Sequence, residues 1–361
     1  MTQLTRPFEG LKIVELASVL AGPLVGSFFS ELGAQVIKIE NSLSNGDVTR
    51  TWKLSIENEK LNTSAYYHCS NFGKKIVMLD FTNKDDYEKA IFYILQADIV
   101  ITNFQKKTAE KLKIDVKTLS QLKKDLILVQ LNAFEYDDPR AGYDIVMQAE
   151  AGFIAMNGYK NALAKMPVAM IDILAAHQMK EAILVALISK AKGETGCIIH
   201  VSLFHSAISA LVNQATNFLM EGYIAEPMGT LHPNIAPYGE MSTTLDGHLI
   251  IWAIGSDLQF EKLMNYFKIS IQDFPQFATN KKRVLNRIEL QSLLNEACKK
   301  FTYSQISSYC DQASIPYGNV KTIDKVLSSP DAQSMIKSND ISQMDKGKYI
   351  SNVAFKIDFN D

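Results

Sequence analysis

The first 131 residues alternate between short apolar runs and longer amphipathic stretches. Short runs of β-branched and aliphatic residues, bounded by turn residues, are typical of buried strands. Between them, Gly22-Pro23 places proline at a helix start, where its missing N–H costs little, and Asn83 is a helix cap before an amphipathic segment. The pattern predicts strands at 12–16, 35–40, 75–80, 98–102 and 126–131, and helices at about 23–32 and 83–96.

Strands that alternate with helices predict an α/β fold whose mostly parallel, Rossmann-like sheet is covered on both faces. In such sheets, ligands bind beyond the carboxyl ends of the strands. The pattern changes after about residue 220: a loop at 227–237 is followed by a hairpin at 240–252 and then by further helices. We therefore expect a large domain at 1–220 and a smaller α+β domain at 225–320.

Asp172 is a lone charge near the start of a long apolar segment, residues 166–192. On pattern alone, the favoured interpretation is a helix N-cap. A catalytic role is compatible with that position, because backbone amides at a helix start stabilise an ionised carboxylate, whereas burial raises its pKa. An ionised Asp in an apolar pocket is a usable nucleophile.

Composition narrows the function classes. The 361 residues are 47% hydrophobic and 21% charged, as in a soluble globular protein, and the net charge of −2 argues against nucleic-acid binding. Neither an apolar signal core nor a membrane-spanning run is present, so we expect a cytoplasmic protein without membrane attachment. The six histidines are scattered, and no CxxC spacing that would indicate a metal site occurs among Cys69, Cys197, Cys298 and Cys310.

Several motifs have both an ordinary and a functional interpretation. The first βαβ unit lacks GxGxxG, because its glycines are Gly22, Gly26 and Gly33, so a nicotinamide or flavin site is disfavoured. Segment 103–107, Asn-Phe-Gln-Lys-Lys, follows a strand end: it suits turn chemistry, and equally an adenine nucleotide with phosphates. Lysines at 74–75 resemble ordinary solvated residues.

Taken together, the motifs resemble the class III CoA-transferases, the family of formyl-CoA transferase and crotonobetainyl-CoA:carnitine CoA-transferase. Single pieces are weak, but their order and spacing are specific, and they extend over most of the chain. They are Gly10-Leu-Lys-Ile-Val-Glu-Leu, Leu20-Ala-Gly-Pro23, Leu32 to Glu40, Gly46-Asp47, Arg50, Asn71 to Lys75, Leu79-Asp80, Asn103-Phe104, Gly142-Tyr-Asp144, Gln148-Ala149, Pro167 to Asp172, His232-Pro233, Pro237-Tyr238, Asp246-Gly247, Asn286-Arg287, Pro316 and Gly318.

The resemblance implies an enzyme that moves CoA from an acyl-CoA thioester to a carboxylic acid through aspartyl anhydride and aspartyl-CoA thioester intermediates, with Asp172 as the nucleophile. It implies no metal and no permanently bound cofactor, with CoA as a substrate. Two ring-shaped subunits would interlock as a homodimer, and segment 321–361 would return to the large domain. The residues expected to contact CoA are Leu20, Ala21, Arg50, Lys74, Lys75, Asn103, Phe104, Lys111, Tyr143 and Asp144.

Some positions depart from the family pattern. The chain has Asn41 where a basic residue is common and Lys111 where an Arg is common. It has His200 in a motif that usually reads Val-Asp-Val-Ser-Leu. A glycine-run loop of formyl-CoA transferases is missing near 225–232. Neither the acyl donor nor the acceptor acid follows from the sequence.

Two other functions stay open. The α-methylacyl-CoA racemases share this fold, but their acid/base pair typically includes a His where this chain has Tyr143, and a phenol ionises only near pH ~10. The alternative from another class is a non-catalytic acyl-CoA-binding protein, in which Asp172 is only a helix cap.

Overall fold

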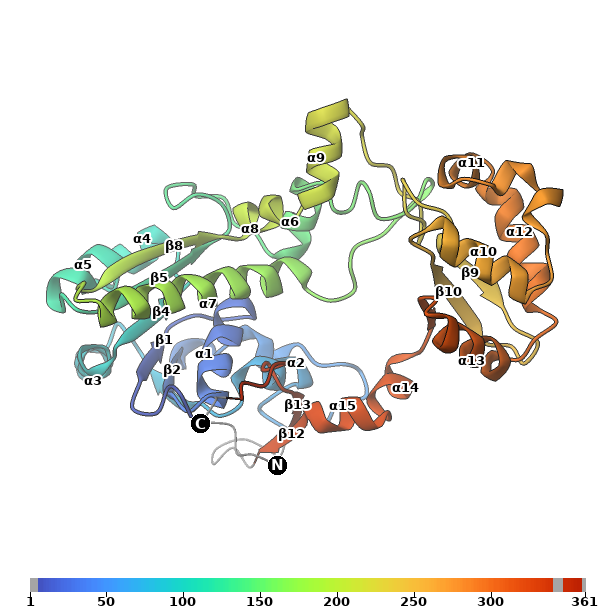
Figure 1. Cartoon of the computed structure of the whole chain (residues 1–361). Coiled ribbons are helices and arrows are strands. Elements are labelled where there is room, and N and C mark those ends of the chain that lie inside the picture. Colours follow the sequence, from blue (N-terminus) through green and yellow to red (C-terminus); the bar gives the residue numbers. More distant parts are fainter. Residues whose placement is uncertain (1–5, 340–346, 359–361) are drawn as a thin grey trace. The chain divides into compact units, whose positions relative to one another are not determined.

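The computed structural model describes residues 6–339 and 347–358. The chain divides into two compact units. Unit 1 comprises the segment up to Ile154, Lys165–Ala225 and the chain from Asp331 onward, whereas unit 2 comprises Ala155–Ala164 and Glu226–Pro330 (Figure 1). Each unit has a hydrophobic core of its own.

Unit 1 is built on a six-stranded sheet in the order β3-β2-β1-β4-β5-β8, in which every pairing is parallel. This confirms the predicted mixed α/β architecture with a parallel sheet. The pattern did not predict β8, an edge strand whose residues are mostly exposed or only partly buried. The strands are β1 (Lys12–Glu15), β2 (Gln35–Asn41), β3 (Lys75–Leu79), β4 (Ile99–Thr102), β5 (Ile127–Asn132) and β8 (Cys197–Ser202).

Helices cover both faces of this sheet (Figure 1). Because side chains alternate along a strand, Ile13 joins the core beneath α1 and α7, whereas Val14 joins the core beneath α3 and α5. Burial of an aliphatic or aromatic side chain contributes about 1.5–3 kcal/mol. The helices are α1 (Ala21–Glu31), α2 (Ala65–Asn71), α3 (Lys84–Gln96), α4 (Lys106–Lys111), α5 (Val116–Leu122), α6 (Asp144–Glu150), α7 (Met170–Ala191), α8 (Leu203–Ser209) and α9 (Val212–Glu221), with short 3₁₀ turns η1 (Ser42–Ser44) and η2 (Val48–Thr51).

The C-terminal part of unit 1 contains α15 (Pro330–Met335), which begins at the last residue of unit 2, and an antiparallel pair, β12 (Ile336–Asn339) and β13 (Gly347–Ile350). Strand β13 packs on α2: the Tyr349 ring stacks on Phe72 with ring centroids 3.4 Å apart. Phe72 is buried, so this contact closes one side of α2.

Unit 2 contains a three-stranded antiparallel sheet around the buried Trp252 and Phe260. The hairpin predicted around Asp246-Gly247 is present as β9 and β10. The elements are β6 (Gly158–Tyr159), β7 (Ala162–Leu163), β9 (Tyr238–Thr243), β10 (Leu249–Ala253), β11 (Tyr317–Asn319), α10 (Asp257–Tyr266), η3 (Ile271–Asp273), η4 (Pro275–Phe277), α11 (Asn280–Leu285), α12 (Arg287–Cys298), α13 (Tyr303–Ala313) and α14 (Ile323–Leu327). Across the described parts of both units, no helix has the length and apolar character needed to cross a membrane.

Candidate active site

Helix α7 begins two residues before Asp172. Its N-cap is Ala169, which makes no side-chain cap hydrogen bond. Asp172 therefore lies in the first turn of the helix, and the prediction that it is the N-cap is wrong. The helix can begin before Asp172 because a side chain from another helix caps its first turn.

Asp144, the first residue of α6, supplies that cap. Its Oδ1 accepts a hydrogen bond from the Ile171 N–H at 2.7 Å, and its Oδ2 accepts one from Gln148 Nε2 at 2.6 Å. Gln148 in turn accepts from the Met166 N–H at 2.8 Å. An amide of the first turn of α7 is thus satisfied from outside the helix, and α6 fixes the place where α7 starts.

The Asp172 carboxylate is buried, with 7% of the residue exposed. Burial, assisted by the negative charge of Asp144, raises the pKa of Asp172 to about 7. No group in the described part of the chain donates a hydrogen bond to this carboxylate. The sequence suggested that the helix N-terminus would keep Asp172 ionised, but desolvation outweighs that effect, which is ordinarily worth only ~0.3–1 kcal/mol.

Three aromatic residues gather near Asp172 and Asp144. Trp52 contacts both Tyr66 and Tyr143 edge-to-face, with ring centroids 5.1 Å and 6.4 Å apart. Burial and the nearby Asp172 carboxylate raise the pKa of Tyr66 to about 12, so its phenol remains a hydrogen-bond donor at neutral pH. Sequence reasoning missed Trp52 and Tyr66; the available signal was a Trp two residues after Arg50 in an otherwise polar stretch.

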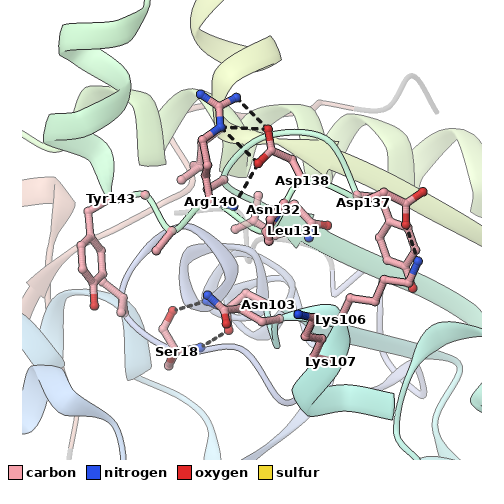
Figure 2. Close-up of a pocket in the computed structure, with 18 residues that line it drawn as sticks. Ser18, Asn103, Lys106, Lys107, Leu131, Asn132, Asp137, Asp138, Arg140 and Tyr143 are labelled. Carbon is pink, nitrogen blue, oxygen red and sulfur yellow. Dashed lines mark hydrogen bonds and ion pairs between the residues drawn. The ribbon is translucent and has the colours of Figure 1, made fainter. Parts of the chain in front are cut away.

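Two pockets lie at the carboxyl ends of the central strands. The first, of about 340 Å³, is called here the Tyr143 pocket. Figure 2 shows Tyr143 at one side of it and Lys106 and Lys107 at the other. The second, of about 500 Å³, is called the Phe104 pocket. Both are lined by Ser18, Asn103 and Gln105.

Asn103 joins the end of β4 to the loop after β1. Its Oδ1 accepts from the Ser18 N–H at 3.1 Å, and its Nδ2 donates to the Ser18 carbonyl at 3.0 Å (Figure 2). The next residue, Val19, has φ +74°, an unusual conformation for a β-branched side chain that costs on the order of 1–3 kcal/mol. Leu20 and Ala21 follow, buried, as the N-cap and first residue of α1.

Charged residues on the rim of the Tyr143 pocket are paired with one another. Lys106 Nζ contacts the Asp137 carboxylate, and Arg140 donates to Asp138 from Nη2 at 2.7 Å (Figure 2). All four side chains are at least partly solvent-exposed. Exposed pairs of this kind contribute little to stability, so an anionic ligand can compete with the carboxylates for the basic groups.

Arg50 and Lys74 lie inside networks of ion pairs. The Arg50 Nε atom donates to Glu40 at 2.7 Å, and its Nη2 donates to the Tyr67 hydroxyl at 2.7 Å. The Lys74 amine is buried and donates to Glu15 at 2.8 Å, to the Pro23 carbonyl and to Asn71. Neither residue lines either pocket.

Of the other residues predicted to contact CoA, the structure brings Asn103, Phe104 and Tyr143 to the pockets, and Asp144 to the start of α7. Lys75 and Lys111 are exposed and line neither pocket. Within the described residues, no three His, Cys, Asp or Glu side chains gather in a way that could hold a metal ion.

Comparison with known protein families shows that residues 8–361 match CoA-transferase family III. The chain belongs to CoA-transferase family III. The resemblance read from the motifs is therefore confirmed.

Relatives of this family III chain include a succinate–glutarate CoA-transferase of Agrobacterium fabrum, 33% identical over 91% of the chain and 83% of the relative. A succinyl-CoA:glutarate CoA-transferase of Homo sapiens is 30% identical over 90% of the chain and 74% of the relative. Among solved structures, a CAIB/BAIF family protein from Brucella suis is 34% identical, with a TM-score of 0.84 over 99% of this chain and 94% of that one.

Proposed function

We propose that the protein transfers CoA from an acyl-CoA thioester to a carboxylic acid, with the Asp172 carboxylate as nucleophile. The observation that carries the proposal is the state of Asp172 in a family III chain: its carboxylate is buried, has no hydrogen-bond donor among the described residues and lies beside an aromatic wall. Lone pairs that no donor occupies are free to attack an acyl carbon.

Two exchanges make up the reaction. The ionised Asp172 attacks the thioester carbonyl, which gives a mixed aspartyl anhydride and releases CoA thiolate. The thiolate then attacks the aspartyl carbonyl, which gives an enzyme-CoA thioester and releases the donor acid. The acceptor carboxylate attacks this thioester, which breaks the C–S bond, forms a second anhydride and releases CoA thiolate. The thiolate then attacks the acyl carbonyl of the acceptor, so that the new acyl-CoA leaves and the Asp172 carboxylate is regenerated.

The surroundings of Asp172 suit this sequence. With a pKa of about 7, roughly half of the enzyme carries the ionised nucleophile at neutral pH. Leu20 and Ala21 stand at the start of α1, where backbone N–H groups lack intrahelical acceptors and can donate to a thioester oxygen. Tyr66 stays protonated and offers a further donor.

We assign the CoA moiety to the two pockets that share Asn103. Phe104 supplies an apolar wall to one pocket, and Lys106 and Lys107 supply positive charge to the other. Phosphate groups favour such lysines, and the present partner of Lys106 is the exposed carboxylate of Asp137. In this assignment Arg50 and Lys74 support the pocket region through their ion-pair networks and do not contact phosphate.

For the acids, we propose four- and five-carbon dicarboxylates, with succinyl-CoA as donor. The support is the pair of relatives at 33% and 30% identity, which carry the names of succinate and glutarate transferases. This substrate choice replaces the formyl-CoA and carnitine type as the working hypothesis for this chain.

We also propose a homodimer. Helix α9 supports it, because this helix has no buried residue and exposes Phe218, Leu219 and Met220. Apolar surface of this kind is ordinarily covered by a partner. Light scattering of the purified protein tests the proposal, and a monomeric mass would contradict it.

Trapping of the enzyme-CoA thioester tests the function. The protein is incubated with succinyl-CoA and then treated with borohydride, which reduces an aspartyl thioester to a homoserine side chain. Peptide mapping is expected to locate this change at Asp172 alone. Asp172→Ala and Asp172→Asn should give neither the modification nor transfer to glutarate.

An exposed carboxylate provides the matched control: Asp125→Asn should behave as the wild type, because the Asp125 side chain is 58% exposed and lines neither pocket. Two outcomes would contradict the proposal. Exchange of an α-proton for deuterium without modification of Asp172 indicates a racemase, and binding of acyl-CoA with neither reaction indicates a binding protein.

A further inference from the structure

The loop between β1 and α1, residues 17–20, is anchored at consecutive peptide groups by side chains from distant segments. Besides the Asn103 contacts to Ser18, Lys38 Nζ donates to the Ala17 carbonyl at 2.8 Å. The Val19 N–H donates to both carboxylate oxygens of Asp47, at 3.1 and 3.3 Å. Carbonyl and amide groups along this turn are thus held from β2, from the start of η2 and from the end of β4.

Val19 is the residue for which such an anchor matters most. Its φ of +74° lies in the left-handed region, which is sterically unfavourable for a side chain branched at Cβ. A strained residue persists only where its surroundings over-determine its conformation. The Ser18–Val19 peptide group is restrained at its carbonyl by Asn103 and at its N–H by Asp47. Of the two, Asp47 bonds to Val19 itself.

Asp47 is itself rigidly held. Its Oδ1 accepts from the Thr49 N–H at 3.0 Å and from the Thr49 hydroxyl at 2.9 Å, and its Oδ2 lies 3.0 Å from Lys38 Nζ. The side chain is completely buried. Burial alone would raise the pKa of Asp47. The Lys38 ammonium and the Thr49 hydrogen bonds outweigh burial and hold this pKa below its ordinary value, so the carboxylate is ionised at neutral pH. All of these partners are protein groups.

The anchored loop is the wall that the two pockets share. Ser18 borders both pockets, Val19 lines the Tyr143 pocket, and Asp47 lines the Phe104 pocket. We propose that Asp47 is a positioning residue for CoA transfer, which holds the Val19 peptide in its left-handed conformation and thereby sets the wall against which the acyl-CoA lies. This inference rests on the proposed function.

A purely structural role for Asp47 would be to neutralise Lys38. That ammonium has a second acidic partner, Glu15 at 3.1 Å, so removal of Asp47 does not leave it unpaired. The positioning role and the charge-neutralising role differ in which second substitution restores activity after Asp47 is removed. Glycine adopts positive φ as readily as negative φ, so a glycine at position 19 needs less help from Asp47, whereas it does nothing for the charge of Lys38.

The experiment compares wild type, Asp47→Ala, Val19→Gly and the double variant in steady-state transfer from succinyl-CoA to glutarate. Misplacement of a binding wall should lower kcat/KM of Asp47→Ala by about tenfold or more. Addition of Val19→Gly should recover about threefold of that loss. Hydrogen exchange at the Val19 amide should be slow in the wild type and accelerated in Asp47→Ala. Where Asp47→Ala does not fold, Asp47→Asn takes its place throughout.

Asp80 offers a matched control. It makes the same turn with a Thr two residues later, with bonds of 2.7 Å from the Thr82 N–H and 2.6 Å from its hydroxyl, but lines neither pocket. Asp80→Ala should leave kcat/KM unchanged. Full activity in Asp47→Ala, or a double variant no better than Asp47→Ala, would overturn the inference. If the wild type itself transfers no CoA, the proposed function fails, whereas the exchange of the Val19 amide and the CoA affinity of the four proteins still test Asp47.

Discussion

At the scale of single residues, Asp172 combines burial with the lack of a hydrogen-bond donor among the described residues. Buried carboxylates are ordinarily hydrogen-bonded or paired, because an isolated buried charge is costly. The neighbouring Asp144 shows the usual solution: its two oxygens accept from Ile171 and Gln148. Two carboxyl groups near one helix start therefore differ in kind: Asp144 is hydrogen-bonded, whereas Asp172, the proposed nucleophile, is not.

The raised pKa of Asp172 predicts how transfer depends on pH. In the proposed reaction the ionised carboxylate is the nucleophile, and burial together with Asp144 raises its pKa to about 7. Below pH 7 the protonated, unreactive form dominates, so kcat should fall about tenfold for each lower pH unit and level off above about pH 8. Rates of transfer measured between pH 5 and 9 check this. A rate that is constant down to pH 5 would contradict it.

Asp144 should tune that pH profile. Asp144→Asn removes the negative charge that raises the pKa of Asp172 but keeps an acceptor for the Ile171 N–H, so the acid limb should move to lower pH. Asp144→Ala also removes the cap and should lower the free energy of unfolding by about 1 kcal/mol. Glu150→Gln, an exposed residue at the far end of α6, serves as control. An unchanged midpoint in Asp144→Asn would show that the two carboxyls do not interact.

At the scale of elements, the sequence was sufficient for five of the sheet strands, because apolar runs bounded by turns are local signals. The start of α7 was not predictable, since its cap is Asp144, which is distant along the chain. Lys74 resembled a solvated residue because its ionic partner, like the cap of α7, is distant along the chain. The Glu15 carboxylate that pairs with it belongs to β1, whereas Lys74 immediately precedes β3. Only the order of strands in the sheet brings the two together.

Helix α2 depends on a strand from the other end of the described chain. Tyr349 of β13 stacks on the buried Phe72, which directly follows α2. Tyr349→Ala should lower the free energy of unfolding by about 1–2 kcal/mol and, since α2 carries Tyr66, should also lower kcat. Denaturant titration and transfer assays measure the two effects. Ile350→Ala, at a residue that is 46% exposed, should change neither; equal losses in both variants would contradict a specific role for the stack.

At the scale of the whole molecule, each compact unit contains one of the two tryptophans. Trp52 belongs to unit 1 and is 38% exposed, whereas Trp252 is fully buried in the core of unit 2. The separate cores indicate that each unit carries its own stabilising burial. The chain thus contains a natural fluorescent reporter for each unit.

This arrangement predicts where a core defect becomes visible. Leu294 is fully buried in unit 2, so Leu294→Ala should cost about 2–5 kcal/mol there. In a Trp52→Phe background, Leu294→Ala should lower the temperature at which Trp252 emission changes on heating. In a Trp252→Phe background, Trp52 emission should respond to acyl-CoA, because the proposed CoA pockets belong to unit 1. A Trp252 transition that is unaffected by Leu294→Ala would contradict the assignment of this core.

The buried carboxyl of Asp172 has a further consequence, for the stability of the folded chain. Its pKa is raised by burial and by Asp144 from 3.8 to about 7. Between these pH values the unfolded chain gives up a proton that the folded chain retains, so the free energy of unfolding decreases as pH rises through this window. The penalty is fully developed above about pH 7, where thermodynamic linkage sets it at about 4 kcal/mol or less.

Asp172→Asn removes the ionisation and with it the penalty. This variant should melt at a higher temperature than the wild type at pH 8, and the difference should shrink as pH falls toward 4. Thermal unfolding at the two pH values checks this, and an identical difference at both would refute the linkage. On this prediction, the group proposed to carry the reaction lowers the stability of the fold at pH 8, a trade-off between function and stability.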